Sequence, residues 1–226
     1  MSSFERPKTA QEAVLAEIRE QLLDGRLAPG VSVRPDALGD ELGVSAVPVR
    51  EALRILEGEG HVHYRPHRGY VVATLDVDDL VEIYRIRELL ETEAVRRGFP
   101  RLQGDTVARL REIVREMDDV QHDVISLTAV NRRFHFTLFE AAEMPQLVRV
   151  LRILWDSSDR YRVRYLMSPE NRRLVHDQHH RMMQAVADGD AEAFIDESHK
   201  HHEHAIAALA ETLATTAATE AEQKSA

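Results

Sequence analysis

Histidine is the residue type whose abundance in this sequence first calls for a chemical explanation. The chain has 226 residues and twelve histidines, and nine of these follow residue 75. Neutral imidazole is a good ligand for borderline divalent ions such as zinc, nickel and cobalt. The sequence has no cysteine, which excludes disulfides, thiol nucleophiles and thiolate metal sites. Nitrogen and oxygen atoms would therefore supply any ligand set.

The spacing of four polar residues could bring their side chains to one point. Asn131 and His135 are four residues apart and would share one face of a helix. His179 precedes Gly189 by 10 residues, and His201 follows that glycine by 12. If two antiparallel helices meet at the glycine, both imidazoles lie at nearly the same height along them. Three imidazoles and one amide oxygen would suit a divalent ion.

Other histidines compete for the same positions. His176 and His180 are themselves four residues apart, and His202 lies on an apolar stripe of its own expected helix. A lone histidine on an apolar face is also more often a hydrogen-bonded core residue than a ligand. Spacing alone therefore leaves open which of the histidines bind an ion.

Binding of a small organic acid would need a cationic side chain that can hold its carboxylate. The planar guanidinium of Arg87 could bind a carboxylate through two parallel N–H groups. Arg133 and Tyr161 are weaker candidates for the same ligand. For Arg133, as for Arg160 and Arg164, an exposed helix face is the alternative.

Six helices should position these side chains. Breaks at residues 98–100, near 123, at 144–145, at 168–169 and at 189 separate helices expected at about 76–97, 105–121, 126–142, 146–167, 170–188 and 191–215. We therefore expect an all-α domain over residues 76–216. The small, polar residues 217–226 predict a disordered tail.

A different pattern occupies residues 1–75. Helices are expected at about 10–24, 35–42 and 46–59, and Gly43-Val44-Ser45 between the last two is typical of a helix-turn-helix. Two β-rich runs, 61–65 and 70–74, flank a turn that contains Pro66 and Gly69, which predicts a hairpin. A hairpin after a helix-turn-helix is a wing. The chain is thus expected to be mainly α, with a winged helix-turn-helix domain followed by a six-helix bundle.

The third helix of this first domain is the candidate DNA reader, because its first turn would enter a major groove. Arg50 could then bind a guanine edge or a phosphate, with Arg54 one turn further on. Ser45 is the expected N-cap of this helix and could bind a phosphate. The full set of predicted DNA-contacting residues is Arg34, Ser45, Ala46, Val47, Pro48, Arg50, Arg54, His67, Arg68 and Gly69.

The net charge restricts how DNA could be bound. The whole chain carries a formal charge of −10, and residues 1–75 contain 9 Lys or Arg against 11 Asp or Glu. Double-stranded DNA attracts concentrated positive charge. A few arginines must therefore gather on one face while the acidic side chains point elsewhere.

The first domain resembles the GntR family of bacterial regulators over about residues 10–75. The resemblance lies in Leu27–Gly30 (LAPG), Leu42–Ser45 (LGVS), Pro48–Leu53 (PVREAL), Leu56-Glu57 with Gly60, and Arg68-Gly69. It implies that Ser45, Arg50 and the wing near Arg68 contact operator DNA. Asp36, Ala46 and Val47 depart from the arginine or threonine that members often carry there, which indicates an unusual operator sequence.

The second domain resembles the FCD ligand-binding domain of the FadR subfamily over about residues 77–215. Arg87–Glu91 (RELLE), Asn131–His135 (NRRFH), His179 through Asp190, and His201 carry this resemblance, and six helices resemble its VanR-like group. It implies a divalent metal, zinc first and nickel, cobalt or manganese as alternatives, with ligands Asn131, His135, His179 and His201. Aspartate is the more usual residue at position 131. Neutral Asn131 would leave the ion more attractive to a carboxylate.

Together these features predict a homodimeric regulator, repressor-like in sign, that binds double-stranded operator DNA and responds to a small carboxylate. Two alternatives use the same histidines: a metal-dependent enzyme that activates water, and a direct metal sensor. The enzyme is disfavoured because the sequence has no His-Glu-x-x-His motif. With no apolar run of ~20 residues and no apolar segment in the first nine residues, we expect a cytoplasmic protein without a membrane partner.

Overall fold

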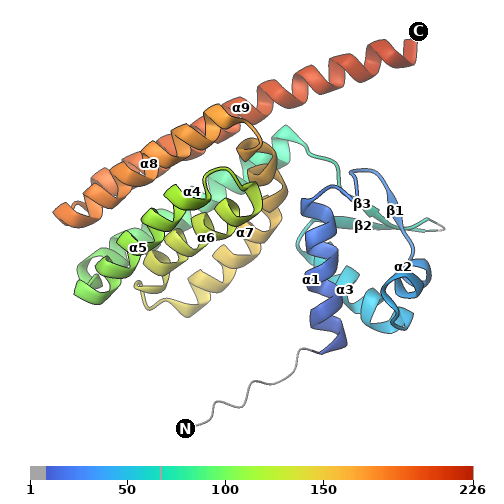
Figure 1. Ribbon diagram of the computed structural model, residues 1–226, viewed down its shortest axis with the longest axis horizontal. Helices are drawn as coiled ribbons and strands as arrows, with labels where there is room; N and C mark the ends of the chain where they lie inside the picture. Colours follow the sequence, from blue (N-terminus) through green and yellow to red (C-terminus); the bar gives the residue numbers. More distant parts are fainter. Residues whose placement is uncertain (1–8, 67, 226) are drawn as a thin grey trace. The chain divides into compact units, whose positions relative to one another are not determined.

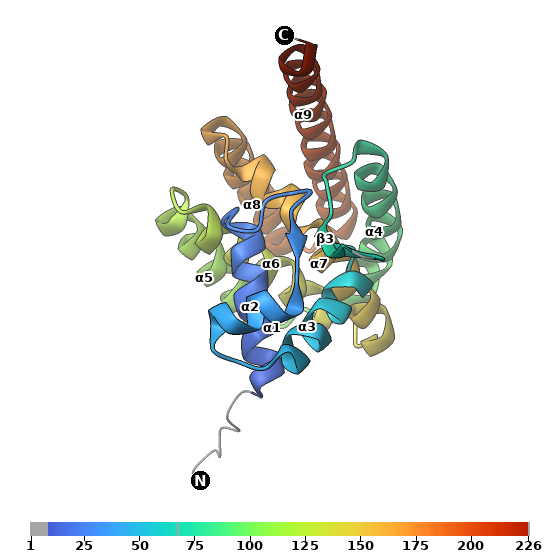
Figure 2. The same cartoon turned by 90° about the vertical axis from the view of Figure 1, so that its right-hand side faces the viewer.

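The computed structural model describes residues 9–66 and 68–225. They form two compact units, Met1–Thr74 and Leu75–Ala226, a boundary one residue from the expected one. Figures 1 and 2 show a small helical unit with a sheet and a larger unit built from helices. The mainly α fold with a small β-hairpin wing is confirmed.

The first unit has three helices and a three-stranded sheet. The helices are α1 (Ala10–Leu23), α2 (Pro35–Leu42) and α3 (Ala46–Gly58), and the strands are β1 (Ser32–Val33), β2 (Val62–Arg65) and β3 (Gly69–Val72). Helix α1 begins with a capping box, in which Thr9 and Glu12 cap each other's backbone N–H. The antiparallel sheet has the order β1-β3-β2. Sequence predicted β2 and β3 but not β1.

Two glycines explain the tight turn between α2 and α3. Gly43 ends α2 in a left-handed conformation with φ 68°. A Cβ atom on Gly39 would lie 2.8 Å from the carbonyl oxygen of Val44, so a larger residue would push the turn away. The two helices can therefore pack closely. The apolar side of α3 is buried against this unit's core, which leaves its other side exposed.

The second unit contains six α-helices in its described part. These are α4 (Val77–Gly98), α5 (Gly104–Val120), α6 (Val124–Glu140), α7 (Pro145–Leu166), α8 (Pro169–Asp188) and α9 (Ala191–Ser225), with a short 3-10 turn η1 (Phe99–Arg101) after α4. Helices begin at Pro145 and Pro169, and Gly189 ends α8 with φ 70°. The predicted six-helix bundle is confirmed.

Helix α6 lies within the core of this bundle. It packs against α4, α5 and α7, and nine of its seventeen residues are buried. Helices α8 and α9 pack against each other around the turn at Gly189, as the spacing of their histidines requires. These contacts bring side chains from α6, α8 and α9 into one buried region.

The structure differs from the sequence expectation at the end of the chain. Helix α9 continues to Ser225, through the residues 217–225 whose composition predicts disorder. Residues 191–225 contain no glycine or proline that would end a helix, and many are good helix formers such as alanine and glutamate. None of the helices in the described ranges is both long enough and apolar enough for a membrane span.

Candidate functional site

Exposed arginines gather where α3 faces the sheet of the first unit. Arg50 and Arg54 are both exposed, one helical turn apart. They line an open hollow together with Pro35, Tyr64 and Gly69. Tyr64 is 57% exposed, and its ring packs edge to face with that of Tyr70, with the centroids 5.5 Å apart. Tyr64 is not among the candidate residues predicted from the sequence. Two guanidinium groups beside an exposed aromatic ring suit a polyanion.

The first turn of α3 presents small side chains. Ser45 is the N-cap, in extended conformation, and its side chain makes no capping hydrogen bond within the described structure. Val47 is 66% exposed, while Ala46 and Pro48 are half-buried. Because the first backbone N–H groups of a helix have no partner inside it, this turn favours a phosphate oxygen.

Arg50 has an acidic neighbour that the sequence pattern did not reveal. Its Nη2 atom donates to Oδ1 of Asp36 across the helix-turn-helix at 3.2 Å. Both side chains are well exposed, so the pair is weak. Arg50 is the side chain that the sequence predicts as the main DNA contact. A DNA group that binds its guanidinium would have to compete with Asp36.

The remaining predicted DNA contacts lie at the edges of the same unit. Arg34 is exposed at the start of α2, and Arg68 is exposed beside β3. Gly69 has φ +77°, and a Cβ atom there would lie 3.0 Å from the carbonyl oxygen of Val33, so the turn requires glycine. His67 lies outside the described residues.

Three of the predicted metal ligands are histidines that lie near one another in the second unit, where His135 and His179 are buried and His201 is half-buried. His135 comes from α6, His179 from α8 and His201 from α9. The Nε2 atoms of His135 and His179 are 3.2 Å apart. Two nitrogens bound to one ion at 2.0–2.1 Å would be about 3.0–3.4 Å apart, so this pair already has ligand spacing. The His201 ring centroid is 5.4 Å from that of His179 and 6.0 Å from that of His135.

Hydrogen bonds at the far side of two rings fix their orientation. Nδ1 of His179 lies 2.7 Å from the carbonyl oxygen of Val175, which can only accept, so this nitrogen carries the proton. Nδ1 of His201 lies 2.7 Å from Oε1 of Gln178 and donates in the same way. In both neutral rings Nε2 carries the lone pair, and that of His179 faces Nε2 of His135. Such outer partners orient metal-binding histidines.

The fourth predicted ligand is buried without a partner. Oδ1 of Asn131 makes no hydrogen bond to any described residue, although the side chain is 1% exposed. Nδ1 of His135 is unpaired in the same region. A buried polar atom without a partner costs free energy. A cation could satisfy this oxygen, and His135 and His179 have the spacing of two ligands. The ligand atoms of His135, His179 and His201 do not all lie within 4.8 Å of one another, so His201 would have to move closer to bind the same ion.

Burial also keeps these imidazoles neutral. It lowers the pKa of His179 to about 4, and it lowers the pKa of His135 and of His201 well below the ordinary value. A proton on His179 would add to this effect at the other two rings. Neutral imidazole is the form that binds a metal ion.

We expect the metal-free protein to lose stability as the pH falls from 7 to 5. The unfolded chain binds a proton at His179 near pH 6.5 and the folded chain near 4. The free energy of unfolding should therefore fall by about 2 kcal/mol from this residue alone. Denaturant titrations of EDTA-treated protein at both pH values measure the change. His179→Gln should lose less stability over this range, and an equal loss would contradict the explanation.

A buried ion pair lies beside the histidines. Arg87 and Glu91, one turn apart on α4, are each 2% exposed, and Nε of Arg87 donates to Oε1 of Glu91 at 2.8 Å. Trp155 donates to the same carboxylate oxygen at 2.7 Å. Burial opposes ionisation of Glu91, but the charges of Arg87 and His202 outweigh it and hold the pKa of the carboxyl below its usual range.

The predicted effector residues already have partners within the second unit. Arg87 already donates to Glu91, to Ser158 and to Nε2 of His202, so a ligand would have to compete for its N–H groups. The Tyr161 hydroxyl is taken by the backbone of Asp76. Arg133 lies on the exposed face of α6, paired with Glu116 of α5, because it is two residues from buried Asn131.

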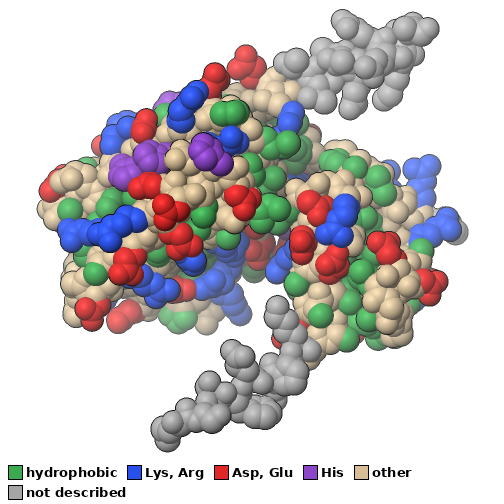
Figure 3. All heavy atoms as spheres, in the orientation of Figure 1, with side chains coloured by type: hydrophobic (Ala, Val, Ile, Leu, Met, Phe, Trp, Pro, Cys, Tyr) green, Lys and Arg blue, Asp and Glu red, His purple; other side chains and the backbone are tan. Residues whose placement is uncertain are grey.

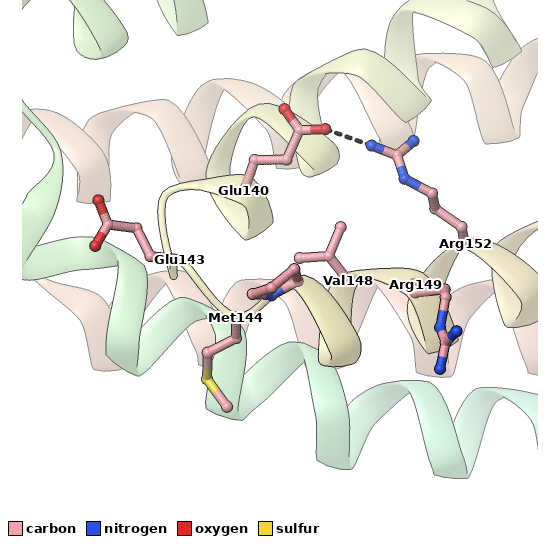
Figure 4. Close-up of a pocket in the computed structure, with 7 residues that line it drawn as sticks. Glu140, Glu143, Met144, Val148, Arg149 and Arg152 are labelled. Atoms are coloured by element: carbon pink, nitrogen blue, oxygen red, sulfur yellow. Dashed lines mark hydrogen bonds and ion pairs between the residues drawn. The ribbon is translucent and has the colours of Figure 1, made fainter.

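The open hollow drawn in Figure 4 lies elsewhere, at the turn between α6 and α7. Met144 and Val148 form part of its lining, and Glu140 pairs with Arg152 beside it. None of the predicted ligands lines it. A smaller hollow between α4 and α9 reaches Glu91. It has no room for a small molecule, so an effector at this hollow requires the region to open.

Comparison with known proteins covers both units. Residues 10–72 match the gntR family of bacterial regulatory proteins, and residues 82–204 match the FCD domain. The chain is 29% identical over 161 residues to the Nta operon transcriptional regulator of Aminobacter aminovorans, covering 71% of this chain and 75% of that protein. It is 31% identical over 152 residues to a probable D-xylose utilization operon transcriptional repressor of Paenarthrobacter nicotinovorans, covering 63% and 65%. The structure of E. coli McbR/YncC has a TM-score of 0.79 at 26% identity, covering 91% of this chain and 99% of that one.

Proposed function

Since this chain belongs to the gntR family of bacterial regulatory proteins and carries an FCD domain, we propose that it represses transcription until a small organic acid binds beside a metal ion. The family makes it a DNA-binding transcription regulator rather than an enzyme. A repressor is supported by the name of the Paenarthrobacter nicotinovorans relative. DNA binding is assigned to the exposed side of α3 and the wing, where Arg50 and Arg54 lie.

The observations that support the metal site are the unpaired Oδ1 of Asn131 and the 3.2 Å separation of the Nε2 atoms of His135 and His179. Asn131, His135, His179 and His201 would hold the ion, with zinc the first choice and nickel, cobalt or manganese as alternatives. All four are nitrogen or neutral oxygen donors, which suits borderline divalent ions. When bound, the ion would supply a positive charge and open coordination positions.

The same donor set supports a carboxylate as effector. None of the four ligands carries a negative charge, so a divalent ion would keep its full charge in a buried environment. Arg87 is neutralised by Glu91, which makes the ion the stronger attraction for an anion. The effector would then complete the coordination of the ion, and Arg87 and Trp155 would form the wall beside it.

A homodimer would place two DNA-binding units on an inverted repeat. Helices α4 and α7 pack against each other, and both carry exposed apolar pairs at helical spacing. Ile86 and Leu89 form the pair on α4, and Val150 and Ile153 form the pair on α7. We expect this apolar surface to contribute to the dimer contact.

We expect a small carboxylic acid to release operator DNA from the metal-loaded protein. A panel of mono-, di- and tricarboxylic acids is first scanned for a rise in Tm, and each hit is then tested for its effect on operator affinity. A working effector should weaken DNA binding about 5- to 150-fold in the wild type, the usual range of coupling between two sites. The His135→Ala variant should not respond. An acid that releases DNA equally from both proteins would place the effector elsewhere.

A direct metal sensor is the second candidate, because the same residues could bind an ion reversibly as the signal. The two functions differ in one titration. Zinc added without any acid changes the operator affinity of a metal sensor, whereas it leaves the acid-responsive regulator bound to DNA.

A further inference from the structure

Two histidines and an aspartate meet at the outer surface of the helical unit, on different side chains from the buried cluster. His176 and His180 lie one turn apart on α8, and Asp118 lies near the end of α5, which packs against α8. Oδ1 of Asp118 is 2.8 Å from Nε2 of His176 and 3.1 Å from Nε2 of His180. Ligand atoms of all three lie within 4.8 Å of one another.

These separations suit a shared ion. Nitrogen and carboxylate oxygen atoms bound to zinc at 2.0–2.2 Å would be about 3.0–3.5 Å apart, so the two distances to Asp118 need adjustments of only a few tenths of an ångström. The two imidazoles are already close, with ring centroids 4.5 Å apart. Because α5 and α8 are packed helices, binding needs movement of the side chains alone.

The second nitrogen of His176 provides independent support. Its Nδ1 atom lies 3.2 Å from Oδ1 of Asp177, while its Nε2 atom faces Asp118. A neutral imidazole has one N–H and cannot donate to carboxylates on both sides. A cation between Nε2 of His176 and Asp118 would let Nδ1 of the same ring donate to Asp177. A carboxylate on the far nitrogen is also the usual partner of a metal-bound histidine.

The surroundings allow an ion to enter. The side chains of Asp118, His176 and His180 are 38%, 32% and 47% exposed, so water could complete the coordination. Figure 3 shows histidine side chains at the surface of the helical unit beside acidic ones. Residues after 75 contain 20 Lys or Arg against 28 Asp or Glu, and this negative charge attracts cations.

We propose that Asp118, His176 and His180 form a second, peripheral site for a borderline divalent ion such as zinc, which ties α5 to α8. His179 lies between the two histidines on α8, on its buried side. An ion at the peripheral site therefore steadies the helix that carries a side chain of the buried cluster. The peripheral site is independent of whether the buried cluster binds metal.

The test is a calorimetric titration of zinc into tag-free, EDTA-treated full-length protein. Wild type is compared with His180→Ala, and His63→Ala is the control because it removes an exposed imidazole of the first unit. We expect His180→Ala to weaken one binding event by more than the roughly 10–100-fold that removal of an outer partner costs. Zinc should also raise the Tm of wild type and His63→Ala more than that of His180→Ala.

The same comparison in a His135→Ala background separates this site from the buried one. In that background zinc should still bind at the peripheral site, and adding His180→Ala should remove this binding. Equal zinc affinities and equal Tm shifts in wild type and His180→Ala would overturn the proposal. The cluster would then be a pair of histidines that contact one aspartate without binding an ion.

Discussion

Replacing Arg50 with alanine should weaken operator binding by about 1–3 kcal/mol, or roughly 5- to 150-fold, if this arginine binds a base edge. Arg50 is exposed on α3, one turn from the helix start, where it can reach a base edge or a phosphate. The measurement is a mobility-shift titration on a fragment selected by the wild type from random-sequence DNA. If Arg50 binds a base, the variant should also relax the selected sequence at that position.

Arg26→Ala is the matched control, because it removes an exposed arginine that pairs with Glu17 and Asp24 instead of facing the α3 hollow. Its operator affinity should stay near that of the wild type. Asp36→Ala should have the opposite effect to Arg50→Ala, since it frees the Arg50 guanidinium and removes a negative charge near DNA. This gain should vanish in the Arg50→Ala background. Unchanged affinity in Arg50→Ala would contradict the assignment of α3 as the DNA reader.

Replacing Glu91 with glutamine should lower the free energy of unfolding by about 3–5 kcal/mol, because it leaves a buried charge on Arg87 without its partner. Glu91 accepts hydrogen bonds from Arg87 and from Trp155, and the carboxylate and the guanidinium are both almost fully buried. Denaturant unfolding followed by circular dichroism measures the destabilisation. Glu88→Gln is the control on the same helix, where the partly exposed pair with Arg85 is worth about 0–1 kcal/mol.

A double variant distinguishes the effect of an unpaired charge from that of poor packing. Replacing Arg87 by methionine together with Glu91 by leucine removes both charges at once. It should destabilise the protein less than Glu91→Gln does, since replacing both members of a buried pair by apolar residues is often tolerated. If the double variant lost as much free energy of unfolding as Arg87→Met and Glu91→Leu lose in sum, the two side chains would not be coupled. The unpaired charge would then not explain the loss in Glu91→Gln.

Local signals made most of the fold predictable. Gly43, Pro145, Pro169 and Gly189 mark helix ends through their backbone conformation alone, so the helix-turn-helix and the six helices follow from sequence. Strand β1 has two residues and forms because β3 offers it an edge, which no local pattern shows.

The candidate sites were predictable where they depend on spacing within one helix. Asn131 and His135 share a face of α6 through their i, i+4 spacing, and both are buried. The same reasoning could have excluded Arg133 from the candidate effector residues, because it is two residues from Asn131 and therefore faces outward. Helical periodicity alone is enough for this conclusion.

Contacts between distant segments could not be predicted. Asp36 of α2 contacts Arg50 of α3, and Gln178 of α8 contacts His201 of α9. The position of Glu91 beside Trp155 depends on how α4 and α7 pack. In each case the helix pattern fixes which face a side chain occupies, while the partner is set by tertiary packing.

The metal content of tag-free protein after gel filtration, in wild type and His135→Ala, tests the central claim of a buried metal site most directly. Removal of one imidazole of the buried cluster should lower the content by about one ion per chain, because structural and sensing sites of this kind bind one ion each. Counting the difference leaves the peripheral histidines out of the result, since they are present in both proteins. Equal metal content in the two proteins, also after zinc has been supplied, would show that the buried histidines are structural and would contradict the account.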